Sequence, residues 1–93
     1  MITAFVMIQV DAGRIPEAAQ AISEQDGVAE VYSVAGGEAD LIAVVRVRQH
    51  EDLAEVIPNR VSKVEGVLST TTHIAFRAFS KHDLEAAFSL GLE

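Results

Sequence analysis

The stretch DGVAEVYSV, Asp26 to Val34, decides the fold because it has a counterpart later in the chain. The counterpart is EGVLSTTTHI, Glu65 to Ile74, and both stretches join an acidic residue, a glycine and a valine to a strand-like run. Each follows a helical pattern, so the chain consists of two strand–helix–strand halves. The order β-α-β-β-α-β is that of a ferredoxin-like α+β fold, in which one antiparallel sheet carries both helices on one face.

The remaining elements are predicted outward from this repeat. Strands are expected over residues 2–10, 28–35, 41–48 and 67–79, and helices over 14–25 and 51–64. Pro58 falls inside the second helical pattern, where its missing N–H predicts a kink or a split. Ser80-Lys81-His82-Asp83 resembles a capping box and predicts a short last helix. The expected division is therefore a domain over 1–79 and a helical extension over 80–93.

The first strand is apolar on both of its faces. Ile2, Ala4, Val6, Ile8 and Val10 share one face, whereas Phe5 and Met7 lie on the other. The helices of a ferredoxin-like fold cover only one face of the sheet. A bare apolar patch on the other face usually marks an interface. We therefore expect a homodimer whose sheets pack face to face.

Composition excludes several classes of function. The 93 residues carry a formal net charge of −7, and the scattered basic residues form no helix-turn-helix pattern, so we expect no direct binding of nucleic acid. No apolar run approaches the roughly 18 residues that span a membrane, and the N-terminus has no basic leader, which predicts a cytoplasmic protein. The chain lacks cysteine, and its three histidines are not at a metal-ligand spacing. Neither a metal nor a cofactor is expected.

Two segments could bind a small molecule, and each also has a purely structural interpretation. In Gly36-Gly37-Glu38-Ala39-Asp40, the aspartate could simply cap the N–H groups of a tight turn. Alternatively, glycine N–H groups could bind a carboxylate while Asp40 or Glu38 binds an ammonium group. In the later run, Ser69, Thr71 and His73 alternate with Thr70, Thr72 and Ile74. Either set could hold a zwitterion, or the threonines could reflect β-propensity alone, with His73 a packed or interfacial residue.

The segments VYSVAGGEADLIAVVRV and VEGVLSTTTHIAF resemble the ligand-binding domain of the Lrp/AsnC family, also called the RAM domain. Gly37 and Asp40 match the family's Gly-x-x-Asp signature. Gly66-Val67, Thr70 and Thr72 match its Gly-Val and Thr-x-Thr pattern. The resemblance covers nearly all of residues 2–79 and is greatest to short stand-alone members without the DNA-binding half.

This resemblance implies a function and a site. Full-length members are transcription regulators with an N-terminal DNA-binding domain; their C-terminal domains dimerise through their sheets and often build octamer-type rings. A small effector, usually an amino acid, binds between dimers near the hairpin and the threonines of the fourth strand. The implied ligand-binding residues are Gly37, Glu38, Ala39, Asp40, Thr70 and Thr72. Ala39 departs from the pattern, because many members carry a larger residue at this position.

The expected function is an effector-binding and oligomerisation module that modulates full-length relatives by assembling with them. One alternative is a small cofactor-free enzyme of the dimeric α+β-barrel type, which would need a polar catalytic group between sheet and helices. The helix-facing side of the predicted sheet is apolar, which counts against this alternative. Another is an ACT-like amino-acid sensor, which has the same fold but lacks the combined hairpin and threonine signature.

Overall fold

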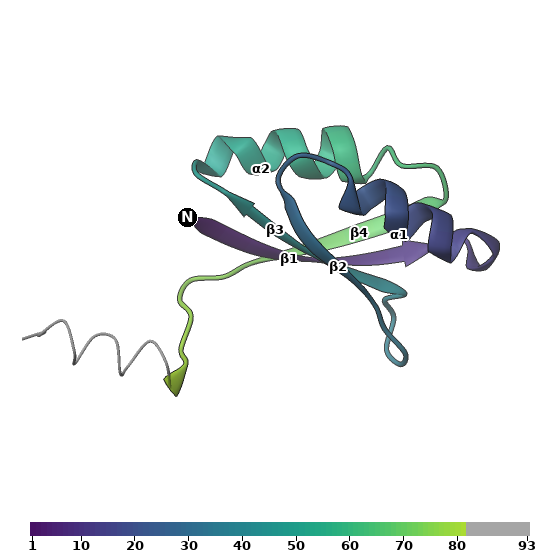
Figure 1. Ribbon diagram of the computed structural model, residues 1–93, viewed down its shortest axis with the longest axis horizontal. Coiled ribbons are helices and arrows are strands. Elements are labelled where there is room, and N and C mark those ends of the chain that lie inside the picture. The colour runs from purple at the N-terminus through teal and green to yellow at the C-terminus, as the bar shows by residue number, and fades with distance from the viewer. Residues whose placement is uncertain (82–93) are drawn as a thin grey trace, which may run out of the picture.

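A computed structural model describes residues 1–81 of the chain (Figure 1). The strands are β1 (Ile2–Val10), β2 (Val28–Ser33), β3 (Leu41–Val47) and β4 (Val67–Ile74), and the helices are α1 (Ile15–Ser23) and α2 (His50–Val56). A single 3₁₀ turn, η1 (Ala12–Arg14), precedes α1, and a π-helical turn, η2 (Ile57–Val61), continues α2. The predicted last helix lies outside the described residues.

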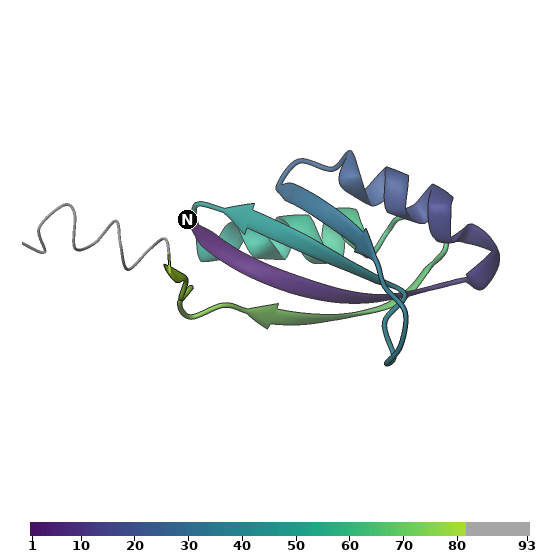
Figure 2. The same cartoon turned by 60° about the horizontal axis from the view of Figure 1, so that its bottom comes forward.

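The strands form one antiparallel sheet in the order β2-β3-β1-β4, which confirms the ferredoxin-like prediction and the central position of β1. Both helices lie on the same face of this sheet (Figures 1 and 2). The register sets the two faces of the sheet. Val6 lies opposite Ala43 and Thr72, whereas its neighbour Met7 lies opposite Ile42 and Thr71.

The core lies between the sheet and the helices. Ala4, Val6 and Ile8 of β1 are completely buried there, together with Ile22 of α1 and Val61 of η2. The opposite side of the sheet, here called the open face, has no covering element among the described residues. Its central rows consist of Thr3, Phe5, Met7 and Gln9 on β1, their neighbours Arg46, Val44 and Ile42 on β3, and His73, Thr71 and Ser69 on β4. The predicted two-sided character of the first strand is therefore confirmed.

Pro58 divides the second helix as predicted. The regular α-helix ends at Val56, and Pro58 is the second residue of the wider turn η2. There the N–H of Ser62 donates to the carbonyl of Ile57, five residues back, at 2.8 Å. Because proline has no N–H to donate, the wider turn continues the helix without the bond that Pro58 would otherwise make.

The predicted fourth strand over 67–79 was too long, because β4 ends at Ile74. The N–H of Ala75 donates to the carbonyl of Thr3 at 2.8 Å, and β1 begins only one residue before Thr3, so no strand remains to pair with the following residues. Residues 75–81, here called the arm, leave the sheet on the side away from the helices (Figure 1). Phe76 of the arm is fully exposed, and Phe79 is 77% exposed. No helix within residues 1–81 has both the length and the apolar character needed to cross a membrane.

Candidate functional site

The loop between β2 and β3, residues 34–40, bends over one end of the open face (Figure 2). Gly37 has a φ of 71°, and a Cβ built on it would meet nothing within 4 Å. The backbone conformation therefore favours glycine, and the space beside its Cα is open. The loop closes where the N–H of Val34 donates to the carbonyl of Asp40 at 3.0 Å.

Asp40 attaches this loop to the first strand. Its Oδ2 atom accepts a hydrogen bond from the N–H of Val10 at 2.8 Å, and its own N–H donates to the carbonyl of Ile8 at 2.9 Å. The Asp40 side chain thus satisfies a donor at the end of β1, where the regular ladder to β4 is interrupted by a bulge. The structure therefore gives Asp40 a structural role, but the N–H group that its side chain binds belongs to β1 and not, as the sequence had suggested, to the turn.

A cavity of about 640 Å³ lies between the loop and the open face. Residues 34–39 of the loop form one wall, and Met7 and Ile42 supply apolar side chains from β1 and β3. The remaining lining is polar and comes from Gln9, Ser69, Thr71 and His73. The cavity therefore combines an apolar floor with hydroxyl, amide and imidazole groups on one side, a composition suited to a small polar molecule with an apolar part.

Gln9 connects the three elements around this cavity. Its Oε1 accepts a hydrogen bond from the Ser69 hydroxyl at 2.9 Å, and its Nε2 donates to the backbone carbonyl of Glu38 at 3.0 Å. This short chain of hydrogen bonds runs from β4 across β1 to the loop. It holds the loop at a fixed distance from the strand and so helps to preserve the cavity.

This arrangement of a glycine-containing loop over a ferredoxin-like sheet agrees with the comparison of sequences. Residues 3–84 match the family model described as the Lrp/AsnC ligand binding domain. The chain belongs to this family.

Individual relatives support the assignment. TTHA0845 from Thermus thermophilus, whose crystal structure is known, is 44% identical, with a TM-score of 0.81 over 87% of this chain and 100% of that one. An uncharacterized HTH-type transcriptional regulator from Pyrococcus horikoshii, PH1916, is 35% identical over 80% of this chain and 51% of its own length. The chain spans about half the length of the curated relatives it matches.

The fold alone is shared with a more distant regulator. The transcriptional regulator NMB0573 from Neisseria meningitidis, in complex with L-Met, has a TM-score of 0.74 at 12% identity, over 85% of this chain and 52% of that one.

Only some of the six ligand-binding residues that the resemblance implies line the cavity of this chain. Gly37, Glu38 and Ala39 do, whereas Asp40 lies behind the loop wall. Thr70 and Thr72 pair with Ile8 and Val6 and so belong to the helix-facing side of β4. The Thr70 hydroxyl lies 3.4 Å from that of Ser62, which directly follows η2. The role of these six residues in binding stays a prediction, but the structure brings only three of them together.

The resemblance placed Thr70 and Thr72 of β4 beside the ligand, but the other set of side chains on this strand lines the cavity. Ser69, Thr71 and His73 lie opposite Gln9, Met7 and Phe5, so they share the open face. The pairing register between β4 and β1 decides which of the two sets lies on the open face. The sequence of β4 alone does not show this. Sequence reasoning missed Gln9 altogether, although an amide near the end of a strand, just before a predicted turn, is a signal that could have marked it.

The charges around the cavity are few. Glu38 is the one charged residue in its lining, and no lysine or arginine is present there among the described residues. The N–H groups of Gly36 and Gly37 donate to no acceptor within residues 1–81. They are therefore available to an anionic group of a ligand. Residues 1–81 contain no cluster of His, Asp and Glu side chains that could hold a metal ion.

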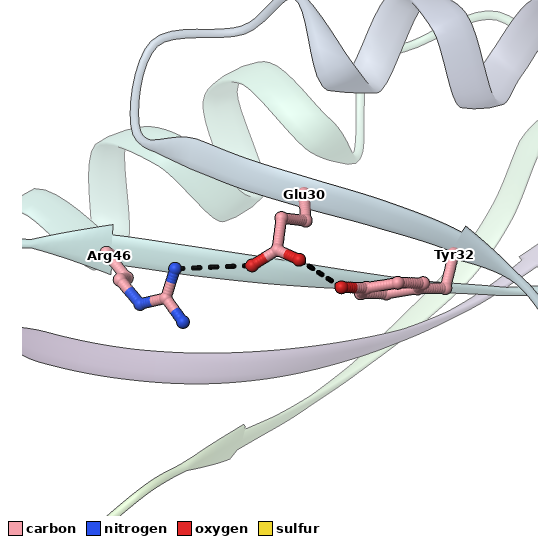
Figure 3. A network of polar contacts seen from close by, with 3 residues as sticks. All are labelled: Glu30, Tyr32 and Arg46. Atoms are coloured by element: carbon pink, nitrogen blue, oxygen red, sulfur yellow. Dashed lines mark hydrogen bonds and ion pairs between the residues drawn. The ribbon is translucent and has the colours of Figure 1, made fainter.

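A polar network borders the open face of this Lrp/AsnC domain along β2 and β3 (Figure 3). The Tyr32 hydroxyl donates to Glu30, and the Arg46 guanidinium lies 3.4 Å from the other Glu30 oxygen. The hydrogen bond from Tyr32, with a smaller contribution from Arg46, lowers the pKa of Glu30 below 4.5. The same hydrogen bond raises the pKa of Tyr32 above 10.0. The network neutralises the charges beside the apolar centre of the open face.

Proposed function

We propose that this chain is an effector-binding and oligomerisation module of the Lrp/AsnC family, and that it binds an amino acid in the cavity beneath the 34–40 loop. The observation that carries the proposal is the cavity itself, which joins the glycine loop of the family signature to polar groups of β4. The L-Met complex of the Neisseria regulator supports an amino acid as the class of ligand. The regulator names of the relatives, and the wholly apolar set of buried side chains within residues 1–81, support regulation over catalysis.

The chemistry of the lining assigns a role to each part of the ligand. The free N–H groups of Gly36 and Gly37, with the Thr71 hydroxyl, hold the carboxylate. Glu38 holds the ammonium group, in a charge-assisted bond of about 1.5–3 kcal/mol. Met7 and Ile42 contact an apolar side chain of the ligand. Ala39 leaves its part of the wall small, so we expect a ligand at least as large as valine.

A thermal-shift screen against the twenty amino acids tests this proposal. A ligand that binds only the folded chain stabilises it by RT ln(1 + [L]/Kd), or about 2.7 kcal/mol at a hundredfold excess over Kd. We expect one or a few apolar amino acids to raise the melting temperature. No stabilisation by any amino acid at millimolar concentration would contradict the assignment of the ligand class.

Two neighbouring threonines then locate the site, because they lie on opposite faces of the same strand. Thr71→Val removes a hydroxyl from the cavity, and Thr72→Val removes one from the helix-facing side. Both changes keep a β-branched side chain in β4, so their effects on the strand are matched. We expect Thr71→Val to weaken binding of the amino acid found in the screen about tenfold, and Thr72→Val to leave it unchanged. Isothermal titration calorimetry measures both, and the reverse result would favour the pair named by the family pattern.

Assembly completes the proposed function. We propose that two chains dimerise by packing their open faces together, and that dimers associate further, into an octamer-type ring or with full-length Lrp/AsnC regulators. Such a role places the chain in the cytoplasm with those regulators and assigns DNA binding to them. The exposed apolar side chain of Phe5, which lies on this uncovered face outside the lining of the cavity, supports the dimer.

A further inference from the structure

The loop and the arm both project from the open-face side of the sheet, but from opposite ends of it (Figure 1). The loop follows β2 at the end where β1 finishes, and the arm follows β4 at the end where β1 begins. Between them lies the apolar centre of the open face. The surface therefore has a raised segment at each end and the twisted sheet between them.

These two raised segments carry opposite charges. Residues 34–40 contain two carboxylates and no basic residue, and residues 75–81 contain Arg77 and Lys81 and no acidic residue. The Glu38 carboxylate has no partner among the described residues. The Arg77 guanidinium lies over the Phe79 ring, 4.8 Å from its centroid, and has no carboxylate partner within residues 1–81. Arg46, the basic residue on the sheet between them, is already paired with Glu30.

A two-fold axis parallel to the open face and across the strands would exchange the two ends. Each loop would then face the partner's arm, and every such contact would occur twice, as in any isologous interface. An axis along the strands would instead place two acidic loops together and two basic arms together. The second arrangement is disfavoured, because like charges that meet at an interface repel and oppose association.

We propose that, in the face-to-face dimer, the arm of each chain docks against the loop of the other, with Arg77 paired to the partner's Glu38 and the exposed rings of Phe76 and Phe79 covered by the partner. The proposal rests on the dimer of the proposed function and adds its orientation and its contact residues. It also explains why two large aromatic side chains remain exposed in a segment that leaves its own fold.

This arrangement affects the effector cavity. The cavity of a single chain contains a carboxylate and, within residues 1–81, no cation. Arg77 from the partner would stand at the rim and pair with one oxygen of Glu38, which leaves the other oxygen for the ligand's ammonium group. The remaining N–H groups of the guanidinium are then able to bind the ligand's carboxylate. The site is then completed by dimerisation, so ligand affinity depends on assembly.

A charge-exchange experiment tests the contact. Glu38→Arg and Arg77→Glu each place like charges at both copies of the contact, and we expect each to weaken the dimer about tenfold or more in sedimentation equilibrium. The double variant, with both changes in one chain, restores opposite charges and should recover most of the affinity. Arg48→Glu, an exposed reversal of the same charge outside the arm, is the matched control and should not be rescued by Glu38→Arg.

The outcomes separate this inference from the dimer itself. If the unmodified chain is monomeric at micromolar concentrations, both the dimer and the arm contact are wrong. If the unmodified chain dimerises but the double variant loses as much dimer affinity as the two single changes added together, the arm contact is wrong and the dimer is still supported. Circular dichroism should show all variants folded, since neither side chain contributes to the core.

Discussion

Asp40 is the residue for which the structure changes the interpretation most. Its carboxylate receives the Val10 N–H at 2.8 Å in a partly buried position, so its removal leaves a donor at the end of β1 without its partner. We expect Asp40→Ala to lower the free energy of unfolding by about 1–3 kcal/mol, and Asp40→Asn, which keeps an acceptor oxygen, to lower it less. Urea denaturation measures both. The ligand affinity of the folded Asp40→Asn protein should stay within about threefold of that of the unmodified chain. A loss of affinity of one to two orders of magnitude would show that Asp40 binds the ligand.

Tyr32 lowers the pKa of Glu30 through its hydrogen bond. Because the Tyr32 hydrogen bond is the larger cause of the lowered pKa of Glu30, Tyr32→Phe should raise that pKa toward 4.5, and Arg46→Gln should raise it less. A lowered pKa means that the folded state holds fewer protons than the unfolded state. The contribution of Glu30 to stability is therefore present above pH 4.5 and declines as the pH falls through the lowered pKa. Carbon-detected NMR titration of the Glu30 carboxyl measures the shift, and a larger effect of Arg46→Gln would contradict this ranking of causes.

At the scale of elements, the turn that begins β2 allows a sharp comparison between two glycines. Gly27 has a φ of 95°, and a Cβ added there would lie 2.6 Å from Cγ2 of Val56 in α2. Gly37 also has a positive φ, but open space surrounds it. Gly37→Ala should therefore lower stability by about 1–2 kcal/mol through backbone strain alone, and Gly27→Ala by about 1–3 kcal/mol more through overpacking. Thermal and urea unfolding of the two variants measure the difference. Equal losses of stability would show that the Val56 side chain moves away at little energetic cost.

The elements also show what the sequence could predict. Periodicity and the repeated acidic-Gly-Val segments were sufficient for the order of strands, and Pro58 was sufficient for the break in the second helix. The end of β4 was not predictable from its own residues, because Phe76 and Phe79 continue a strand-like pattern. It is set by the first residues of β1, which leave nothing for residue 76 to pair with.

The same non-local cause explains why the predicted set of site residues differs from the lining of the cavity. Gly37, Glu38 and Ala39 belong both to the predicted set and to the cavity lining, because the turn that contains them is a local signal. The choice between Thr70 with Thr72 and Ser69 with Thr71 depends on the register between β1 and β4. Register is fixed by long-range packing, and a shift of one residue exchanges the faces of a strand.

For the whole molecule, the open face is the surface on which assembly depends. Phe5 lies at its centre and is 39% exposed in the single chain. A charge placed there would be desolvated in a face-to-face dimer, so Phe5→Glu should dissociate the dimer while the chain stays folded. Sedimentation velocity with circular dichroism measures both properties. Ala54→Glu adds the same charge to an exposed position of α2 and should leave the dimer intact; a dimer that survives Phe5→Glu would move the interface to another surface.

The strand order β2-β3-β1-β4 has a consequence for the order in which the protein can be made. β1 is synthesised before the other strands, yet one of its edges is completed only by β4, and the bond between Ser69 and Gln9 spans 60 residues of chain. On the ribosome, β1, α1, β2 and β3 can associate while the far edge of β1 still offers unpaired backbone groups. Contacts so distant in sequence form slowly, and an open apolar edge is prone to pair with a neighbouring nascent chain. Completion of the sheet therefore has to await the emergence of β4, and until then the free edge of β1 is open to pairing with another nascent chain.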